Sequence, residues 1–450
     1  MTLDTRSLTL LDRALKELEA GFGNLPEFNP AVDLAAVGEV LMEVARRMRD
    51  NYPYHHPMYI GQMIKPPHPV ARLAYMLSLW INPNNHSADG GRCSTAMEKE
   101  AVAGIARMIG WDTHLGHICS GGTMANLEAL WISRCLHPGK KIAASAQAHF
   151  TQERICSVLS IPFVSVRCDR DARIDPNALE DLLRREQIGT VVVTTGTTAT
   201  GSVDPLPEVL ELRKRYGFRI HADAAYGGYF LLADNLEPKT QASLEALAQV
   251  DSIVIDPHKH GLQPYGCGCV LFKDPGVGRF YKHDSPYTYF TSDELHLGEI
   301  SLQCSSPGAS AVALWATQRL LPMVKAGEFG RDLARSRKAA LELFGFLGQD
   351  NRFVRRLIPE LDIVVWTLRG SSVHESSQLA RRVFQEAAAA DLHLAVASLP
   401  CSFLFGGDRE ATLDQEEVVC LRACLMKPEH LDWIDRVEQE LCAATDRALG

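Results

Sequence analysis

The sequence predicts an α/β protein whose core is a mainly parallel β-sheet wrapped by helices. Between residues 140 and 256, short β-rich runs alternate with amphipathic stretches, which is typical of parallel strands joined by helical crossovers. The 450 residues are 46% hydrophobic, which is enough for a large core in two or three domains. After about residue 325, a long charged helical stretch precedes an isolated strand, which indicates a smaller C-terminal α+β domain.

The individual elements follow from local patterns. Strands are expected where β-branched and apolar residues dominate, at 140–145, 162–168, 189–196, 218–225, 252–256 and 361–368. Helices are expected where Ser, Thr, Pro, Asp or Gly opens or closes an amphipathic stretch, at 1–23, 95–109, 123–136, 176–186, 206–216, 327–347 and 429–447. We predict an N-terminal helical segment (1–60), a large α/β domain (61–325) and a small domain (326–450).

Composition excludes several classes of function. The net charge is −9 with both signs spread along the chain, which argues against a nucleic-acid or membrane surface as the main partner. The twelve Cys include no C-x-x-C pair, which predicts reduced thiols in the cytoplasm. The close pairs Cys267/Cys269 and Cys420/Cys424 are interpreted as packed thiols, so no metal is expected.

A glycine-rich turn opens the helix expected at 123–136. Ser120, Gly121, Gly122 and Thr123 offer free backbone N–H groups at the positive end of a helix dipole, and the glycines allow close approach of an anion. The turn lacks the G-K-[ST] of a nucleotide P-loop. It predicts a phosphate site, although an ordinary helix start has the same composition.

Two ionisable residues stand at the ends of apolar strands. Asp223 lies near the end of 218–225, where a carboxylate needs a cation or strong donors, unless it only caps the next turn. Lys259 follows 252–256, where lost hydration favours a nucleophilic amine. The competing interpretation of Lys259 is a surface residue in a turn.

Polar residues end two further strands. Thr197 and Thr198 follow 189–196 and are expected to present their hydroxyls at the same edge. His149 follows 140–145, although a lone His is more often structural. Ligands of open α/β sheets bind beyond the carboxyl ends of strands, so these motifs are expected to converge. A phosphate cradle, a carboxylate for a pyridine nitrogen and a Lys for a Schiff base are what pyridoxal 5'-phosphate (PLP) requires.

The amino-acid sequences of these motifs also resemble those of a known family. "SGGTMANL" (120–127), "HADAAYGG" (221–228) and "DPHK" (256–259) are similar to the group II PLP-dependent amino-acid decarboxylases, and the similarity extends from about 56 to 315. The resemblance implies the aspartate-aminotransferase type of fold (fold type I), with a large seven-stranded sheet domain. It also implies a homodimer with the active site at the subunit interface.

The resemblance assigns a role to each motif residue. Lys259 forms the Schiff base with the cofactor, and Asp223 pairs with the protonated ring nitrogen. His149 lies on one face of the ring and Ala225 on the other. The remaining cofactor contacts come from Gly121, Gly122, Thr123, Thr198 and His258.

A long loop is expected at 282–298, because this stretch mixes Ser, Pro, Thr, Asp and Gly with two tyrosines. The resemblance implies that this loop crosses the dimer interface and offers a Tyr that protonates the carbanion after CO2 leaves. We prefer Tyr289 to Tyr287 as this donor. The alternative is that both rings only pack between subunits, in which case His149 becomes the next candidate.

The sequence departs from the family pattern at two positions. Ser306 stands where many members carry an Arg that would grip a carboxylate. Either the substrate is anchored in a different way, or another basic group, such as Lys282 or a His of "HHP" (55–57), supplies that charge. Asp256 lies near the expected phosphate and needs a compensating donor.

We therefore expect α-decarboxylation of an L-amino acid to the amine and CO2 by a cytoplasmic homodimer. The same scaffold could instead support an aldehyde-forming oxidative decarboxylase or a C–C lyase, and a PLP-binding protein without turnover is the non-enzymatic alternative. Tyrosines within 52–59 and 285–290 favour an aromatic substrate, although rings packed at a dimer interface would look alike.

Overall fold

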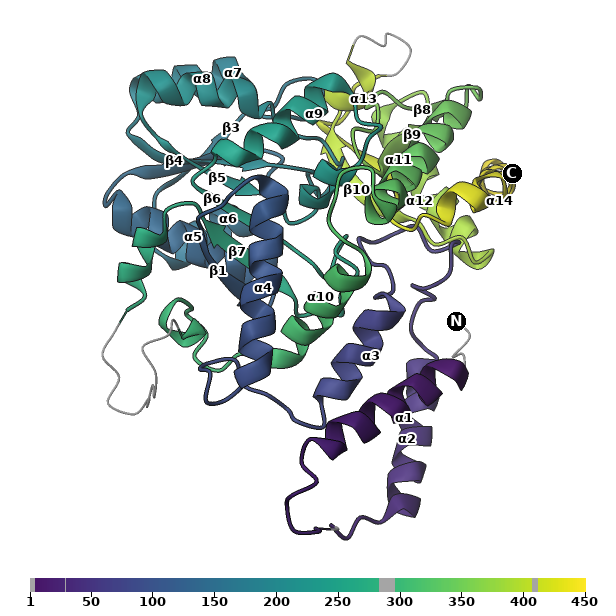
Figure 1. Ribbon diagram of the computed structural model, residues 1–450. Coiled ribbons are helices and arrows are strands. Elements are labelled where there is room, and N and C mark those ends of the chain that lie inside the picture. The colour runs from purple at the N-terminus through teal and green to yellow at the C-terminus, as the bar shows by residue number, and fades with distance from the viewer. Residues whose placement is uncertain (1–4, 29, 283–295, 407–411) are drawn as a thin grey trace.

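The computed structural model describes residues 5–28, 30–282, 296–406 and 412–450. Its centre is a seven-stranded sheet of order β1-β7-β6-β5-β4-β2-β3, surrounded by helices (Figure 1). Only β7 runs against its neighbours, and the pairs from β6 through β3 are all parallel. The predicted mainly parallel α/β fold is therefore confirmed. The strands are β1 Leu115–Cys119, β2 Lys141–Ser145, β3 Phe163–Val166, β4 Ile188–Thr194, β5 Arg219–Asp223, β6 Ser252–Ile255 and β7 Gly268–Phe272.

Local capping sets the ends of the surrounding helices. The Asp175 side chain accepts hydrogen bonds from the N–H groups of Asn177 and Ala178, and Pro176 occupies the first turn of α7. Gly217, with φ at +69°, ends α8 in the left-handed region that favours glycine. These helices are α4 Arg92–Ile109, α5 Gly122–Leu136, α6 Thr151–Val158, α7 Pro176–Arg185, α8 Leu206–Tyr216, α9 Pro238–Glu245 and α10 Gly308–Leu320. Short 3₁₀ helices are η1 Gly228–Leu232, η2 Ala246–Gln249, η3 Pro275–Phe280 and η4 Leu297–Glu299.

The central strands are buried on both faces. All seven residues of β4 and all four of β6 are buried, as expected for parallel strands covered by helices on either side. Their apolar side chains leave no solvent-facing stripe for polar groups. The polar residues that follow these strands, such as Thr198 and Lys259, lie at the carboxyl edge of the sheet.

A second sheet, antiparallel throughout, forms the C-terminal part in the order β10-β11-β9-β8. Its own core is centred on Trp366, which is fully buried. The elements are α11 Glu328–Leu347, β8 Phe353–Val354, β9 Ile363–Leu368, α12 Val373–Ala389, β10 Ala395–Pro400, α13 Ser402–Phe405, β11 Glu417–Cys424 and α14 His430–Leu449. This part has the predicted α+β character, while domain boundaries near residues 60 and 325 stay a prediction.

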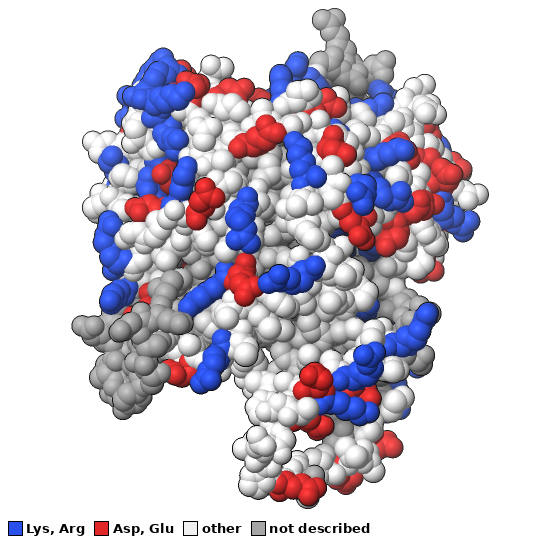
Figure 2. Space-filling model, in the orientation of Figure 1, with Lys and Arg blue, Asp and Glu red and all other residues white. Residues whose placement is uncertain are grey.

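Two N-terminal helices, α1 (Thr5–Ala20) and α2 (Leu34–Met48), form a hairpin that projects from the rest of the molecule beside α3 (Pro69–Ser78) (Figure 1). No residue of α2 is buried. On the face drawn in Figure 2, acidic and basic side chains are interspersed over the protein. Within the described ranges, no helix has the length and apolarity needed to span a membrane.

Candidate active site

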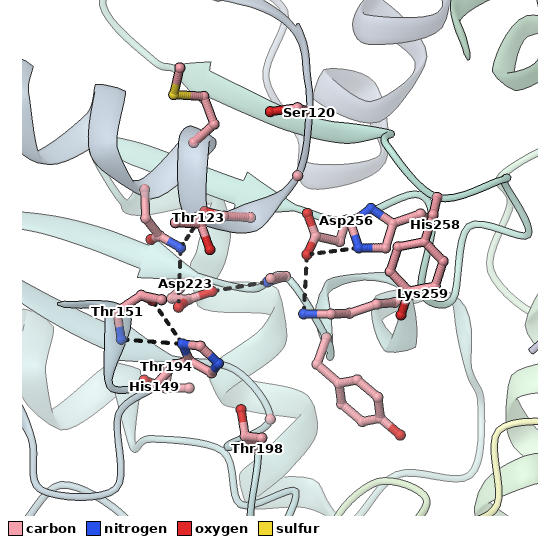
Figure 3. Close-up of a pocket in the computed structure, with 18 residues that line it drawn as sticks. Ser120, Thr123, His149, Thr151, Thr194, Thr198, Asp223, Asp256, His258 and Lys259 are labelled. Atoms are coloured by element: carbon pink, nitrogen blue, oxygen red, sulfur yellow. Dashed lines mark hydrogen bonds and ion pairs between the residues drawn. The ribbon is translucent and has the colours of Figure 1, made fainter. Parts of the chain in front are cut away.

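A cavity of about 340 Å³ lies beyond the carboxyl ends of the central strands (Figure 3). The structure brings together all nine residues that the sequence assigned to cofactor contacts, because each follows or ends a strand of the same sheet. The cavity lining includes Gly121, Gly122, Thr123, His149, Thr198, Asp223, Ala225, His258 and Lys259.

Lys259 lies in the turn after β6 and points into the cavity toward Asp256 (Figure 3). Its Nζ is 3.1 Å from Asp256 Oδ2. His258 Nε2 is 3.6 Å from the same oxygen, while His258 Nδ1 lies 2.8 Å from the carbonyl of Cys267, to which it donates. Burial lowers the pKa of His258. The compensating donor that Asp256 needs is therefore the Lys259 ammonium.

The glycine turn before α5 is shaped for an anion. Gly121 has φ at +146°, and a Cβ there would lie 3.3 Å from the His258 ring. A Cβ on Gly122 would come within 2.7 Å of Asp256 Oδ2. No side chain caps the start of α5, so its first N–H groups are free for a ligand. This backbone fits the phosphate group of PLP.

Asp223, at the end of β5, is 6% exposed and is held by side-chain amides. Its Oδ2 accepts hydrogen bonds from Gln152 Nε2 at 2.8 Å and Asn126 Nδ2 at 3.3 Å. Among the described residues, no Lys, Arg or His nitrogen lies within 4.0 Å of this carboxylate. A buried carboxylate that is held by amides and lacks a cation fits the protonated ring nitrogen of PLP.

The amides that hold Asp223 are themselves fixed. Asn126 Oδ1 accepts hydrogen bonds from Gln152 Nε2 at 3.0 Å and from His221 Nε2 at 2.8 Å. Burial lowers the pKa of His221 to about 4, so its imidazole is neutral at pH 7. His221 Nδ1, at 2.9 Å, accepts from the Ser252 hydroxyl. The chain from Ser252 to Asp223 therefore has one consistent set of donors and acceptors.

His149, Thr197 and Thr198 differ in their positions relative to the cavity. His149 Nδ1 lies 2.8 Å from the Thr151 hydroxyl, and burial lowers its pKa although Asp223 opposes the shift. Thr198 lines the cavity. Thr197 does not: it is fully buried, with its hydroxyl 2.7 Å from that of Thr200. The expectation that Thr197 presents its hydroxyl at this edge is therefore wrong, because the turn directs it inward.

Ser306, which stands at the family's Arg position, lies outside the cavity lining, and so do the residues proposed to replace that Arg. Ser306 donates its N–H to Asn84 Oδ1 at 3.1 Å, outside the cavity. Lys282 is exposed and His56 packs edge-on against Trp433, so neither lines the cavity. The same is true of His55. Tyr287 and Tyr289 lie outside the described residues.

Arg422 of β11 is a buried guanidinium beside the cavity wall that sequence reasoning did not identify. It donates to the carbonyl of Thr198 at 2.8 Å and to that of Gly61 at 3.2 Å. Its Nε is buried and makes no hydrogen bond within the described structure. It connects the C-terminal sheet to the loop that presents Thr198.

Other cavity residues were also missed. Tyr265 packs over His258, with ring centroids 4.6 Å apart, and Tyr226 contributes to the wall. Asn126 could have been found, because it lies four residues after Gly122 and thus on the same face of α5. No local signal points to Gln152, which lies outside the cavity lining and whose contact with Asp223 depends on how α6 packs.

Comparisons with known proteins agree with these features. The pyridoxal-dependent decarboxylase conserved domain matches residues 52–325. An L-tyrosine decarboxylase of Enterococcus faecium is 28% identical over 412 residues, covering 69% of this chain and 67% of that protein. An L-aspartate decarboxylase of Thermococcus kodakarensis is 30% identical over 285 residues, covering 63% and 72%. The crystal structure of Oryza sativa TDC with PLP and tryptamine shares the fold, with a TM-score of 0.76 at 16% identity and coverage of 97% and 96%.

The matched domain takes in every strand of the seven-stranded sheet and every residue of the cavity lining. It covers more than half of the chain, which confirms the resemblance found in the sequence. The protein therefore belongs to the pyridoxal-dependent decarboxylase family and is a PLP-dependent carboxy-lyase that removes the α-carboxylate of an amino acid.

Proposed function

We propose that the 340 Å³ cavity is the catalytic site, with Lys259 as the covalent attachment point of PLP. The observation that carries the proposal is that Lys259, the cation-free carboxylate of Asp223 and the uncapped start of α5 line one cavity. Gly121, Gly122 and Thr123 would hold the phosphate, with His258 beside them. When bound, PLP withdraws electrons from the bond between Cα and the carboxylate.

The protein's own residues set the charge at that site. Asp223 holds a proton on the ring nitrogen, because its buried carboxylate has no other cationic partner in the described structure. His149 is expected to pack on the ring as a neutral imidazole, since burial lowers its pKa. Ala225 would pack from the other side, and Thr198 would face the ring edge.

Gln152 is proposed as a positioning residue for Asp223. We expect Gln152→Leu to lower kcat by about tenfold, because one charge-assisted hydrogen bond of about 1.5 kcal/mol is lost. KM should be unchanged, since Gln152 is not among the residues lining the cavity. Steady-state kinetics on the PLP-loaded enzyme measures both quantities.

The matched control for this prediction is Gln187→Leu, which changes an exposed glutamine outside the cavity. It should leave kcat at the wild-type value. If Gln152→Leu instead raises KM with kcat intact, Gln152 does not act through Asp223.

We infer that the substrate is an aromatic L-amino acid and that the products are the amine and CO2. The described cavity wall includes Tyr226, Tyr265 and Met124. Its only Lys or Arg is Lys259, which already faces Asp256. An acidic side chain would therefore meet no free guanidinium in the described lining, whereas an aromatic ring would meet apolar and aromatic surface.

A panel of the twenty amino acids tests the substrate inference. Amine, aldehyde and CO2 are measured for each. We expect tyrosine, phenylalanine or tryptophan to give the highest kcat/KM, with amine and CO2 in equal amounts. Preference for L-aspartate, the substrate in the name of the T. kodakarensis relative, would contradict the inference. Aldehyde as the main product would favour the oxidative reaction.

Tyr289 is proposed as the proton donor to Cα, with Tyr287 as the second candidate. Tyr289→Phe should reduce amine formation without loss of covalent cofactor, because only the phenol proton is removed. Product analysis, together with the visible spectrum of the bound cofactor, separates the two effects. If Tyr289→Phe, Tyr287→Phe and the double variant all form amine at the wild-type rate, this loop is not the proton source.

We further infer a cytoplasmic homodimer. The projecting α1–α2 hairpin exposes large apolar side chains, including Leu34 and Leu41 of α2, and a second copy would cover them. All twelve cysteines are unpaired, which suits a reducing compartment. Light scattering should give twice the chain mass of 49.7 kDa, and a monomer at micromolar concentration would contradict the dimer.

A further inference from the structure

A second cavity, of about 270 Å³, lies between α11, the segment leading into α3, and the connection from β11 to α14. It shares no lining residue with the catalytic cavity. Two lysines contribute to its lining, and both are almost fully buried: Lys65 is 9% exposed and Lys427 is 4% exposed.

Neither ammonium group is fully satisfied. Lys65 Nζ donates to the carbonyl of Met426 at 3.3 Å, and Lys427 Nζ donates to that of Tyr59 at 2.7 Å. An ammonium has three protons, so each lysine retains unused donors. In the described structure, no carboxylate oxygen lies within 4.0 Å of either nitrogen.

The charges of the two lysines are poorly compensated. Burial lowers the pKa of Lys65 to about 8, although the more distant Asp362 and Asp332 raise it. Burial lowers the pKa of Lys427 to about 7; the negative charge of Glu429 opposes this decrease and repulsion from Lys65 adds to it. Buried cations are costly unless they are paired, so an anion bound between them would relieve this cost.

The remaining lining decides which anion fits. Phe329 and Leu333 of α11 are buried apolar walls, and several prolines extend that surface. Arg72 adds a third basic side chain to the lining, and Asp332 and Glu429 add two carboxylates, which would repel a second negative charge on the ligand. A single carboxylate joined to an apolar body matches this combination better than a phosphate dianion does.

We propose that this cavity binds a small organic carboxylate, whose charged group contacts Lys65 and Lys427 and whose apolar body packs against Phe329 and Leu333. Because the two cavities have no lining residue in common, this ligand occupies a site separate from that of the substrate. The inference is independent of the catalytic roles proposed above.

The first test measures thermal stability of the PLP-loaded enzyme with 3-phenylpropionate as the probe. A ligand that binds only the folded state raises Tm with its concentration. We expect a saturable increase with 3-phenylpropionate and none with the neutral 3-phenylpropanamide. An equal increase with inorganic phosphate would show a general anion site and overturn the carboxylate assignment.

Variants locate the effect. Lys65→Met and Lys427→Met keep the length of the side chain and remove its charge, so the fold should be retained. Each should abolish the increase in Tm, while the exposed Lys239→Met should keep it. An increase that persists in both buried-lysine variants would place the probe elsewhere, including the catalytic cavity, and would overturn the proposal.

Chemical labelling of lysines in the wild-type enzyme tests the same site without requiring any variant to fold. An amine-acylating reagent is applied with and without 3-phenylpropionate, and peptides are quantified by mass spectrometry. Lys65 and Lys427 should lose labelling at the probe concentrations that raise Tm, while Lys239 should not. Unchanged labelling of both buried lysines would overturn the proposal.

Discussion

Replacing Lys259 with alanine should lower kcat/KM by at least about 10⁴-fold, on the scale seen when a covalent catalytic residue is removed. Lys259 is the only Lys or Arg in the described cavity lining, so no neighbouring amine can take its place. Steady-state amine release measures the loss. The exposed Lys239→Ala, outside the cavity, should retain wild-type activity.

The same change has a structural cost that must be separated from the chemistry. Without the ammonium, the buried Asp256 carboxylate loses its partner at 3.1 Å, and we expect a stability loss of about 1–3 kcal/mol. The double variant Lys259→Ala/Asp256→Asn should recover that stability without recovering turnover. Activity near the wild-type value in either variant would contradict the role of Lys259.

Asp223→Asn should reduce kcat by about 100- to 1,000-fold, comparable to the loss of one preorganised electrostatic contact. A neutral amide cannot hold the proton on the ring nitrogen. In addition, the Asn oxygen can accept from Gln152 and Asn126 only if its NH2 group replaces the oxygen that now accepts from the N–H of Ala225, where a donor would face a donor.

The measurement for Asp223→Asn combines kinetics with the visible spectrum of the bound cofactor. Cofactor should still bind covalently, because Lys259 and the turn before α5 are unchanged. Asp175→Asn, which alters the N-cap of α7 outside the cavity lining, should leave kcat unaffected. Equal kcat in Asp223→Asn and wild type would show that Asp223 is only a structural cap.

Much of the fold was predictable because its determinants are local. The helix predicted at 176–186 is observed as Pro176–Arg185, since an N-cap Asp and a Pro in the first turn are visible in the sequence. Strands β1 and β7 were not predicted. Both are short and contain Gly and Cys, and β7 is inserted between β1 and β6, a pairing that depends on distant parts of the chain.

The candidate site could be predicted from the sequence to a similar extent. Residues at strand ends converge because the sheet is parallel, so Asp223, Lys259 and His149 could be placed together. Which of two adjacent threonines faces the cavity depends on the backbone of the turn, and Thr197 was assigned wrongly. Gln152 and Arg422 reach the site only through packing of α6 and of the C-terminal sheet.

The most direct test of the central claim is to locate the cofactor. PLP-loaded enzyme is reduced with borohydride, digested and analysed by peptide mass spectrometry. We predict the phosphopyridoxyl mass on the peptide that contains Lys259. Lys65 and Lys427 are the strongest alternative attachment sites within the protein, because burial lowers the pKa of both amines and so makes them nucleophilic. Cofactor attached to either of these lysines, with Lys259 unmodified, would contradict the assignment of the active site.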